Sequence, residues 1–220
     1  MKRQSLKEII RKATHEAILE VVGTWEPEQN QMAQRAANWK TNTLPIVYGW
    51  DYVPESRGQA NKEQEEVRKF VEVLENGKQQ LPNNLYQRVQ RKATTIIAST
   101  LSGAFGDKVA NITLVPIPAQ DSQLNARRWK DLMLEICSCS GAENGYGYYY
   151  YERLMAPNLS NGNLNGNQEG YWDRKFFSQK NVVLLDVQLS EQAMEQAKKQ
   201  LEKLGANVIM GLVFAKTQTQ

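Results

Sequence analysis

The residue types best suited to ligand chemistry lie in the C-terminal half of the chain. Arg127 and Arg128 could hold a phosphate or pyrophosphate through paired hydrogen bonds, although an arginine pair on a helix also suits a solvated face or an ion pair. Asp186 closes the apolar run 182–185. Tyr148 and Tyr150 belong to a tyrosine cluster that could stack on a base, or form a half-buried strand edge or a protein interface.

Two other chemistries find little support in the sequence. The chain has one histidine, His15, and no Gly-x-Ser-x-Gly motif, so a serine or cysteine hydrolase is not indicated. Its two cysteines, Cys137 and Cys139, form a Cys-Ser-Cys motif. A zinc site needs about four ligands. We therefore expect reduced thiols and no metal site.

Alternating strand and helix patterns predict the elements that position these residues. Continuous apolar runs at 112–117, 182–185 and 207–214 are typical of buried parallel strands. Stripes of apolar residues at three- and four-residue steps predict helices at 61–75, 85–101, 122–136 and 190–204. The fold class is therefore α/β, a parallel sheet flanked by helices. Ligands of such folds bind at the carboxyl ends of strands, which here are 115–118 and 182–187.

The chain before this pattern reads as a separate N-terminal region at 1–80, mainly helical, followed by the α/β domain at 81–220. Residues 5–22 predict an amphipathic helix, with Ser5 and Glu8 as a capping box. Its apolar stripe must be buried on the domain or on a partner, and consists of Leu6, Ile9, Ile10, Ala13, Ala17, Ile18 and Val21. We expect a short strand or a hairpin at 44–52 and a short strand at 148–154. The Asn/Gly-rich stretch at 158–170 predicts a loop.

The order of these motifs from about residue 80 to 216 resembles the type I phosphoribosyltransferases, closest to their ComF-like branch. That branch has a Val-Pro-x-Pro strand end, an arginine-bearing helix, a flexible loop, a strand ending in two acidic residues, a Thr-Thr-Gly phosphate loop, a helix, Gly-Ala and a final strand. This chain offers Val-Pro-Ile-Pro at 115–118, Arg127 or Arg128, the stretch 158–170, the strand ending at Asp186, and Gly205-Ala206 before 208–213.

The resemblance implies that Asp186 contacts the ribose of phosphoribosyl pyrophosphate. It implies substrate or phosphate contacts from Pro116, Pro118, Arg127, Arg128 and Ser190. Magnesium would be required only if phosphoribosyl pyrophosphate is bound, and no other cofactor is indicated.

The sequence departs from this family at two functional positions. The family has two adjacent acidic residues at this strand end, and this chain has only Asp186. Counting back from Gly205 aligns Asp186 with the second acidic residue of the family, whereas counting forward along the strand aligns it with the first. The phosphate loop reads Gln-Leu-Ser-Glu-Gln at 188–192, without glycine, and Glu191 places a carboxylate where the anion would bind. Ser190 and Glu191 suit the start of an ordinary helix better than they suit a phosphate cradle.

We therefore expect a catalytically degenerate phosphoribosyltransferase-like protein that acts by binding a nucleotide or a protein. Such a protein could be a regulatory or effector subunit of a bacterial system such as defence. The alternative is an active enzyme that transfers or hydrolyses a ribosyl group with Asp186 stabilising the ribose.

Composition limits the partners. The formal net charge is +3, which does not indicate nucleic acid. No apolar run approaches the ~20 residues of a membrane span, and residues 1–13 lack the apolar centre of a signal peptide. We expect a cytoplasmic protein with no membrane contact, whose partner is a protein, a second copy of itself, or a nucleotide or phosphoribosyl ligand.

Overall fold

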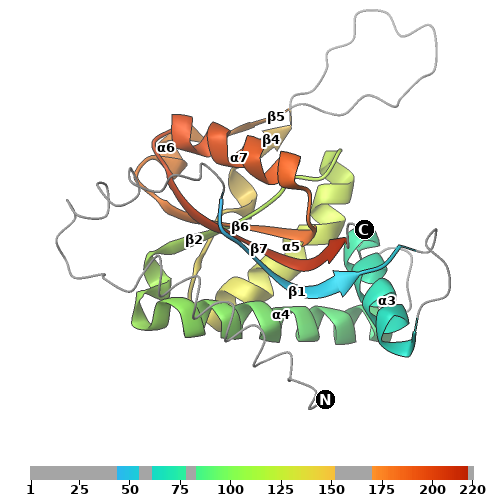
Figure 1. Cartoon of the computed structure of the whole chain (residues 1–220). Helices are drawn as coiled ribbons and strands as arrows, with labels where there is room; N and C mark the ends of the chain where they lie inside the picture. Colours follow the sequence, from blue (N-terminus) through green and yellow to red (C-terminus); the bar gives the residue numbers. More distant parts are fainter. Residues whose placement is uncertain (1–43, 55–60, 78–82, 152–169, 218–220) are drawn as a thin grey trace, which may run out of the picture.

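The computed structural model describes residues 44–54, 61–77, 83–151 and 170–217. Within them lies a parallel five-stranded sheet of order β1-β7-β6-β2-β3, flanked by helices (Figure 1). The predicted α/β class is therefore confirmed. Three predictions lie outside the described residues: the helix at 5–22, the domain boundary near residue 80 and the loop at 158–170. Gly170, at the end of that loop, is the exception.

All strands of the main sheet except β3 coincide with apolar segments of the sequence. Their bounds are β1 Ile46–Tyr52, β2 Ile112–Pro116, β3 Glu143–Asn144, β6 Asn181–Gln188 and β7 Asn207–Thr217. Every residue of β2 is buried, and so is every residue of β6 except its two ends. Burial on both faces explains why these runs are continuously apolar instead of alternating.

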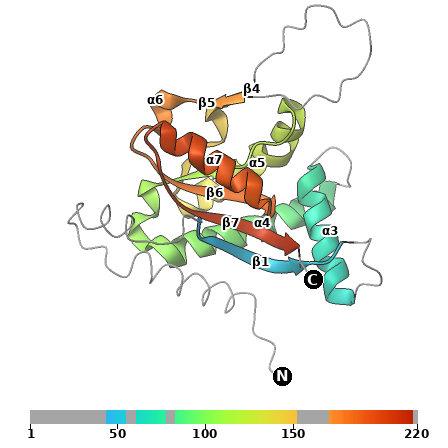
Figure 2. The same ribbon diagram turned by 45° about the horizontal axis from the view of Figure 1, so that its top comes forward.

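Helices cover both faces of the sheet and form two outer layers (Figures 1 and 2). One layer holds α3 Lys62–Asn76, α4 Asn83–Phe105 and α5 Ser122–Ser140, and the other holds α6 Arg174–Phe177 and α7 Glu191–Lys203. Strand β6 serves both cores because its side chains alternate. Val183, Leu185 and Val187 pack toward the first layer, while Val182 and Leu184 pack toward the second.

A short antiparallel hairpin accompanies the main sheet. It pairs β4 Tyr149–Tyr151 with β5 Gly170–Trp172, and the 3-10 turn η4 Tyr146–Tyr148 precedes it. The hairpin is anchored by Trp172, which is buried in the core on the α7 side. The strand expected at 148–154 is thus present as β4 over its described part.

The first strand ties the N-terminal part of the described chain to its C-terminal end. Strand β1 pairs in parallel with β7, from Ile46 opposite Gly211 to Tyr52 opposite Thr217. Ring centroids lie 4.9 Å apart between Trp50 and Phe70, and 5.6 Å apart between Phe70 and Phe214. Strand β1 and helix α3 therefore share one sheet and one core with the segments that carry the candidate site.

No helix in the described part of the chain is long and apolar enough to cross a membrane.

Candidate functional site

The strand order places a topological switch point between β2 and β6, and the crevice that such a point forms is the candidate ligand site. After β2 the chain passes through α5 on one face of the sheet to β3, and after β6 it passes through α7 on the other face to β7. Since β2 and β6 are neighbours, the connections at their carboxyl ends diverge to opposite faces. Such a switch point is where open α/β sheets bind ligands. Both strand ends singled out in the sequence meet here, because Pro116 pairs with Leu185.

The β2–α5 connection is held in place by buried hydrogen bonds. The Ile117 N–H donates to the Leu185 carbonyl at 2.8 Å, and the Trp129 indole N–H donates to the Ile117 carbonyl at 3.0 Å. The Ala119 N–H donates to the Asn125 side chain at 3.0 Å. The backbone of this wall is thus fixed before any ligand arrives.

The β4–β5 hairpin also contacts the β2–α5 connection, and the two prolines of this segment differ in exposure. The Tyr151 hydroxyl donates to the Ala119 carbonyl at 2.9 Å, so β4 is tied to the β2–α5 connection. Pro116 is buried as the last residue of β2, whereas Pro118 is partly exposed in the connection. Of these two predicted contact residues, Pro118 is the one that a ligand can reach directly.

Asp186 lies near the carboxyl end of β6, the strand that neighbours β2. Its side chain is buried, with 7% exposed, and one carboxylate oxygen accepts the Val187 N–H at 2.8 Å. Burial raises the pKa of Asp186 to about 7, against the lowering effects of the Val187 N–H and the positive charge of Arg128, while Glu75 raises it further. A carboxyl group that exchanges its proton near neutral pH in a crevice is a candidate functional group.

The two predicted phosphate-binding arginines are partly buried and lie at a tight helix contact. The Arg128 Nε–H donates to the Glu75 carbonyl at 3.1 Å, which holds the end of α3 against α5. The approach is so close that a Cβ added at Gly77 would lie 2.5 Å from the Arg127 carbonyl oxygen. Arg128 therefore has a structural role at the helix contact, and its charge also acts on Asp186. Burial raises the pKa of Glu75 too, and Arg128 opposes that rise.

The β6–α7 connection is the segment in which the sequence resemblance predicts a phosphate loop. Only Leu189 and Ser190 lie between β6 and α7. The Leu189 N–H donates to the Ala215 carbonyl at 2.9 Å, so it belongs to the pairing with β7. Ser190 is the N-cap of α7, and its hydroxyl accepts the Ala193 N–H at 3.3 Å. The exposed Glu191 follows in the first turn, where it interacts favourably with the helix dipole.

The tyrosines divide between the interior and the surface. Tyr148 stacks on Phe176, with ring centroids 3.4 Å apart and an interplanar angle of 8°, so one of its faces is already covered. Tyr150 is 42% exposed and lies 5.5 Å from the exposed ring of Tyr171 across the hairpin. Of the two predicted stacking residues, Tyr150 is the accessible one.

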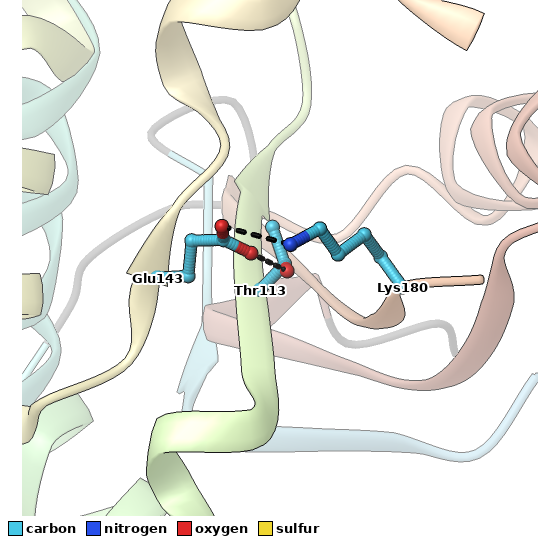
Figure 3. Close-up of polar contacts among 3 residues, drawn as sticks. All are labelled: Thr113, Glu143 and Lys180. Carbon is cyan, nitrogen blue, oxygen red and sulfur yellow. Dashed lines mark hydrogen bonds and ion pairs between the residues drawn. The ribbon is translucent and has the colours of Figure 1, made fainter. Parts of the chain in front are cut away.

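A polar cluster that the sequence did not suggest lies at the opposite end of the sheet (Figure 3). One carboxylate oxygen of Glu143 accepts the Thr113 hydroxyl at 2.6 Å, and the other pairs with the Lys180 ammonium at 2.9 Å. These residues stand at the amino ends of β3, β2 and β6. They join three strands and take no part in the crevice.

Among the described residues, no three histidine, cysteine or acidic side chains come together as metal ligands would. Neither the family models nor the curated proteins compared with this chain include a match.

Proposed function

We propose that this chain is a catalytically degenerate phosphoribosyltransferase-like protein that acts by binding and not by ribosyl transfer. Three observations support the proposal. The sheet has its switch point between β2 and β6, the Val-Pro-Ile-Pro segment and Asp186 meet there, and the elements follow one another in the order of the resemblance. A role as a regulatory or effector subunit of a bacterial system such as defence rests on the resemblance alone.

The observation that carries the proposal is the form of the β6–α7 connection. A phosphate cradle needs several backbone N–H groups directed at one anion, which glycine permits. Here the Leu189 N–H is used by Ala215 and the Ala193 N–H by Ser190, and no glycine is present. The carboxylate of Glu191 adds repulsion for a phosphate. In this proposal Asp186 is the carboxylate that binds hydroxyl groups, and two N–H groups that a phosphate cradle would use already have partners.

This combination favours a ligand that presents hydroxyl groups, such as a nucleoside, over one that depends on a 5′-phosphate. Asp186 would accept hydrogen bonds from ribose hydroxyls, and the exposed ring of Tyr150 offers a surface for a base or a protein partner. Magnesium would come only with a pyrophosphate-bearing ligand.

The second candidate is an active ribosyl-transferring or ribosyl-hydrolysing enzyme. The raised pKa of Asp186, about 7, favours it, because a group that titrates near neutral pH can exchange protons during a reaction. Formation of free pyrophosphate or ribose phosphate from phosphoribosyl pyrophosphate, dependent on Asp186, would establish this alternative.

The proposal is tested by calorimetric titration of nucleosides and their 5′-monophosphates into the full chain. We expect at least one nucleoside to bind, and its 5′-phosphate to add no affinity. Asp186→Asn should weaken that binding by about tenfold, the effect of one lost charged hydrogen bond. Asp107→Asn is the matched control, since Asp107 is an exposed carboxylate in the 3-10 turn η3 Gly106–Asn111. A large gain in affinity from the 5′-phosphate would contradict the proposal.

A further inference from the structure

A groove with a volume of about 460 Å³ lies between α4 and α5, and none of its lining residues belongs to the β2–β6 crevice. Tyr86 lines it from α4, and Asp131, Leu134, Glu135 and Cys139 line it from α5. Small-molecule sites usually have volumes of about 300–1,000 Å³. The groove is therefore large enough to hold a small ligand.

The acidic side chains of this groove lie in a row on α5. Asp131, Glu135 and Cys139 follow one another at four-residue steps, so they share one face of the helix, and neighbours in the row are about 6 Å apart along its axis. Glu135 is partly buried and has no ion pair among the residues that the structure describes. Two carboxylates one turn apart repel each other, and an elongated cation along the row would stabilise both.

The hydroxyl of Tyr86 is a further polar contact in the groove. Tyr86 is 1% exposed, and its hydroxyl has no hydrogen-bond partner among the described residues. A buried hydroxyl without a partner is costly, and most buried polar groups in proteins are hydrogen-bonded. Burial and the carboxylates of Asp131 and Glu135 raise the pKa of Tyr86 to about 12, so the hydroxyl is neutral and lies close to both charges. An N–H group of a ligand would give this oxygen its missing partner.

One wall of the groove is apolar. Leu134 is 67% exposed, the highest value among the large apolar side chains of the described residues. A methylene chain lying on Leu134 would remove apolar surface from water. A bare metal ion suits the groove less well, because in the described part of the chain no three acidic, cysteine or histidine side chains come together as its ligands would.

We propose that the α4–α5 groove binds a linear aliphatic diamine or polyamine. One ammonium group lies against Glu135, and a second lies against Asp131, about one helical turn away. A ligand N–H donates to the Tyr86 hydroxyl oxygen, and the methylene chain covers Leu134. This site is independent of the ligand binding proposed for the β2–β6 crevice.

Calorimetric titration of putrescine and spermidine into the full chain tests the proposal, with linear butanediol as an uncharged probe of similar length. We expect both amines to bind and the diol not to bind. Glu135→Gln should weaken amine binding by about tenfold, the effect of one lost charged hydrogen bond. Glu72→Gln, the same change at an exposed position of α3, is the matched control and should leave binding unchanged. The proposal is overturned if neither amine binds at millimolar concentration, if the diol binds equally well, or if Glu135→Gln has no effect.

Tyr86→Phe separates a ligand contact from a structural role of the hydroxyl. Without ligand, thermal unfolding should show this variant to be at least as stable as wild type, because it removes a buried polar group that has no partner among the described residues. Its affinity for spermidine should fall by about fivefold, the effect of one neutral hydrogen bond. Unchanged affinity would contradict the proposal, and so would a loss of stability without ligand, which would show that the hydroxyl has a partner within the protein.

Cys139 reports whether the amine lies in the groove. It is exposed, whereas Cys137, the other cysteine of the chain, is buried. The rates at which Cys139 reacts with a cationic aminoethyl methanethiosulfonate and with an uncharged methanethiosulfonate are compared as a ratio, which is independent of the thiolate fraction. We expect saturating spermidine, and separately Glu135→Gln, to lower this ratio by about threefold, because each reduces the negative charge that attracts the cationic reagent. An unchanged ratio while spermidine is bound would place the amine elsewhere and overturn the proposal.

Discussion

At the scale of single residues, burial of the Asp186 carboxyl makes its ionisation costly, because the charged form loses its hydration. Its pKa is raised from 3.8 to about 7 on folding. The folded state therefore holds the proton more tightly than the unfolded state does. The stability that this provides is complete below about pH 4 and is lost as the pH rises toward about 7.

Replacing this carboxyl by an amide should remove that pH dependence. We expect wild type to lose stability relative to Asp186→Asn between about pH 4 and about pH 8, by on the order of 1–4 kcal/mol. Urea unfolding of both proteins across this range measures the difference. A difference in unfolding free energy that stays flat with pH would show that Asp186 is not a buried carboxyl with a raised pKa.

Glu143 shows the opposite pH behaviour. Burial acts to raise its pKa, but the hydrogen bonds from Thr113 and Lys180 and the charge of Lys180 lower it overall. A lowered pKa means that the stabilisation is present above the unfolded value, near 4.5, and disappears as the pH falls through the folded value.

We expect Glu143→Gln to lower the free energy of unfolding at neutral pH by about 1 kcal/mol, since the pair is partly exposed. The loss should vanish in acid. Glu195→Gln is the control, because its pair with Lys199, at 3.5 Å on the surface of α7, should contribute less. Denaturant unfolding at neutral and acidic pH compares the two, and equal losses would contradict a special role for the cluster.

These two carboxylates also show what sequence can predict about single residues. Asp186 was identifiable because a lone acidic residue after an apolar run stands at a strand end. Glu143 was not, because its partners are 30 and 37 residues away along the chain and meet it only through strand pairing. No local pattern records such a contact.

At the scale of elements, the end of α3 depends on a glycine. Gly77 has φ of +67°, and an added Cβ would lie 2.5 Å from the Arg127 carbonyl oxygen. Gly77→Ala should therefore destabilise the protein by about 2 kcal/mol or more. Gly103→Ala is the matched control in α4, where a Cβ meets no atom within 4 Å and alanine favours the helix by up to about 1 kcal/mol. Thermal melts that rank the two variants in the reverse order would refute the contact.

Ser190 allows the helix cap and the phosphate contact to be distinguished. As the N-cap of α7, it should tolerate aspartate, which caps equally well, and lose about 1 kcal/mol when changed to alanine. We therefore expect Ser190→Asp to keep both stability and ligand binding, and Ser190→Ala to lose stability alone. If Ser190→Asp instead abolished binding of a phosphorylated ligand, Ser190 would be a phosphate contact.

The helices α3, α4, α5 and α7 were predictable because each is long enough for its apolar stripe to show the helical period. Strand β3 and helix α6 were not, since two and four residues are too few to show any period. Among site elements, the β6–α7 connection was the most informative, because the absence of glycine and the Ser-Glu start already indicated a helix cap.

At the scale of the whole molecule, the order of the strands in the sheet could not be predicted from the sequence. The pattern predicted parallel strands but not that β1, at residue 46, pairs with β7 near the other end of the chain. Trp50 of β1 and Phe214 of β7 both pack against Phe70 beside that pairing, although the three residues are distant in sequence. The switch point between β2 and β6 follows from the same order, so the crevice became definable only in three dimensions.

The central claim is that the crevice binds without a working phosphate loop. Its most direct test is calorimetric titration of phosphoribosyl pyrophosphate with magnesium into wild type and Asp186→Asn. The account predicts no binding up to about millimolar concentration in either protein, since the β6–α7 connection offers no anion cradle. Micromolar binding to wild type that Asp186→Asn abolishes would contradict it and would establish an intact phosphoribosyl pyrophosphate site.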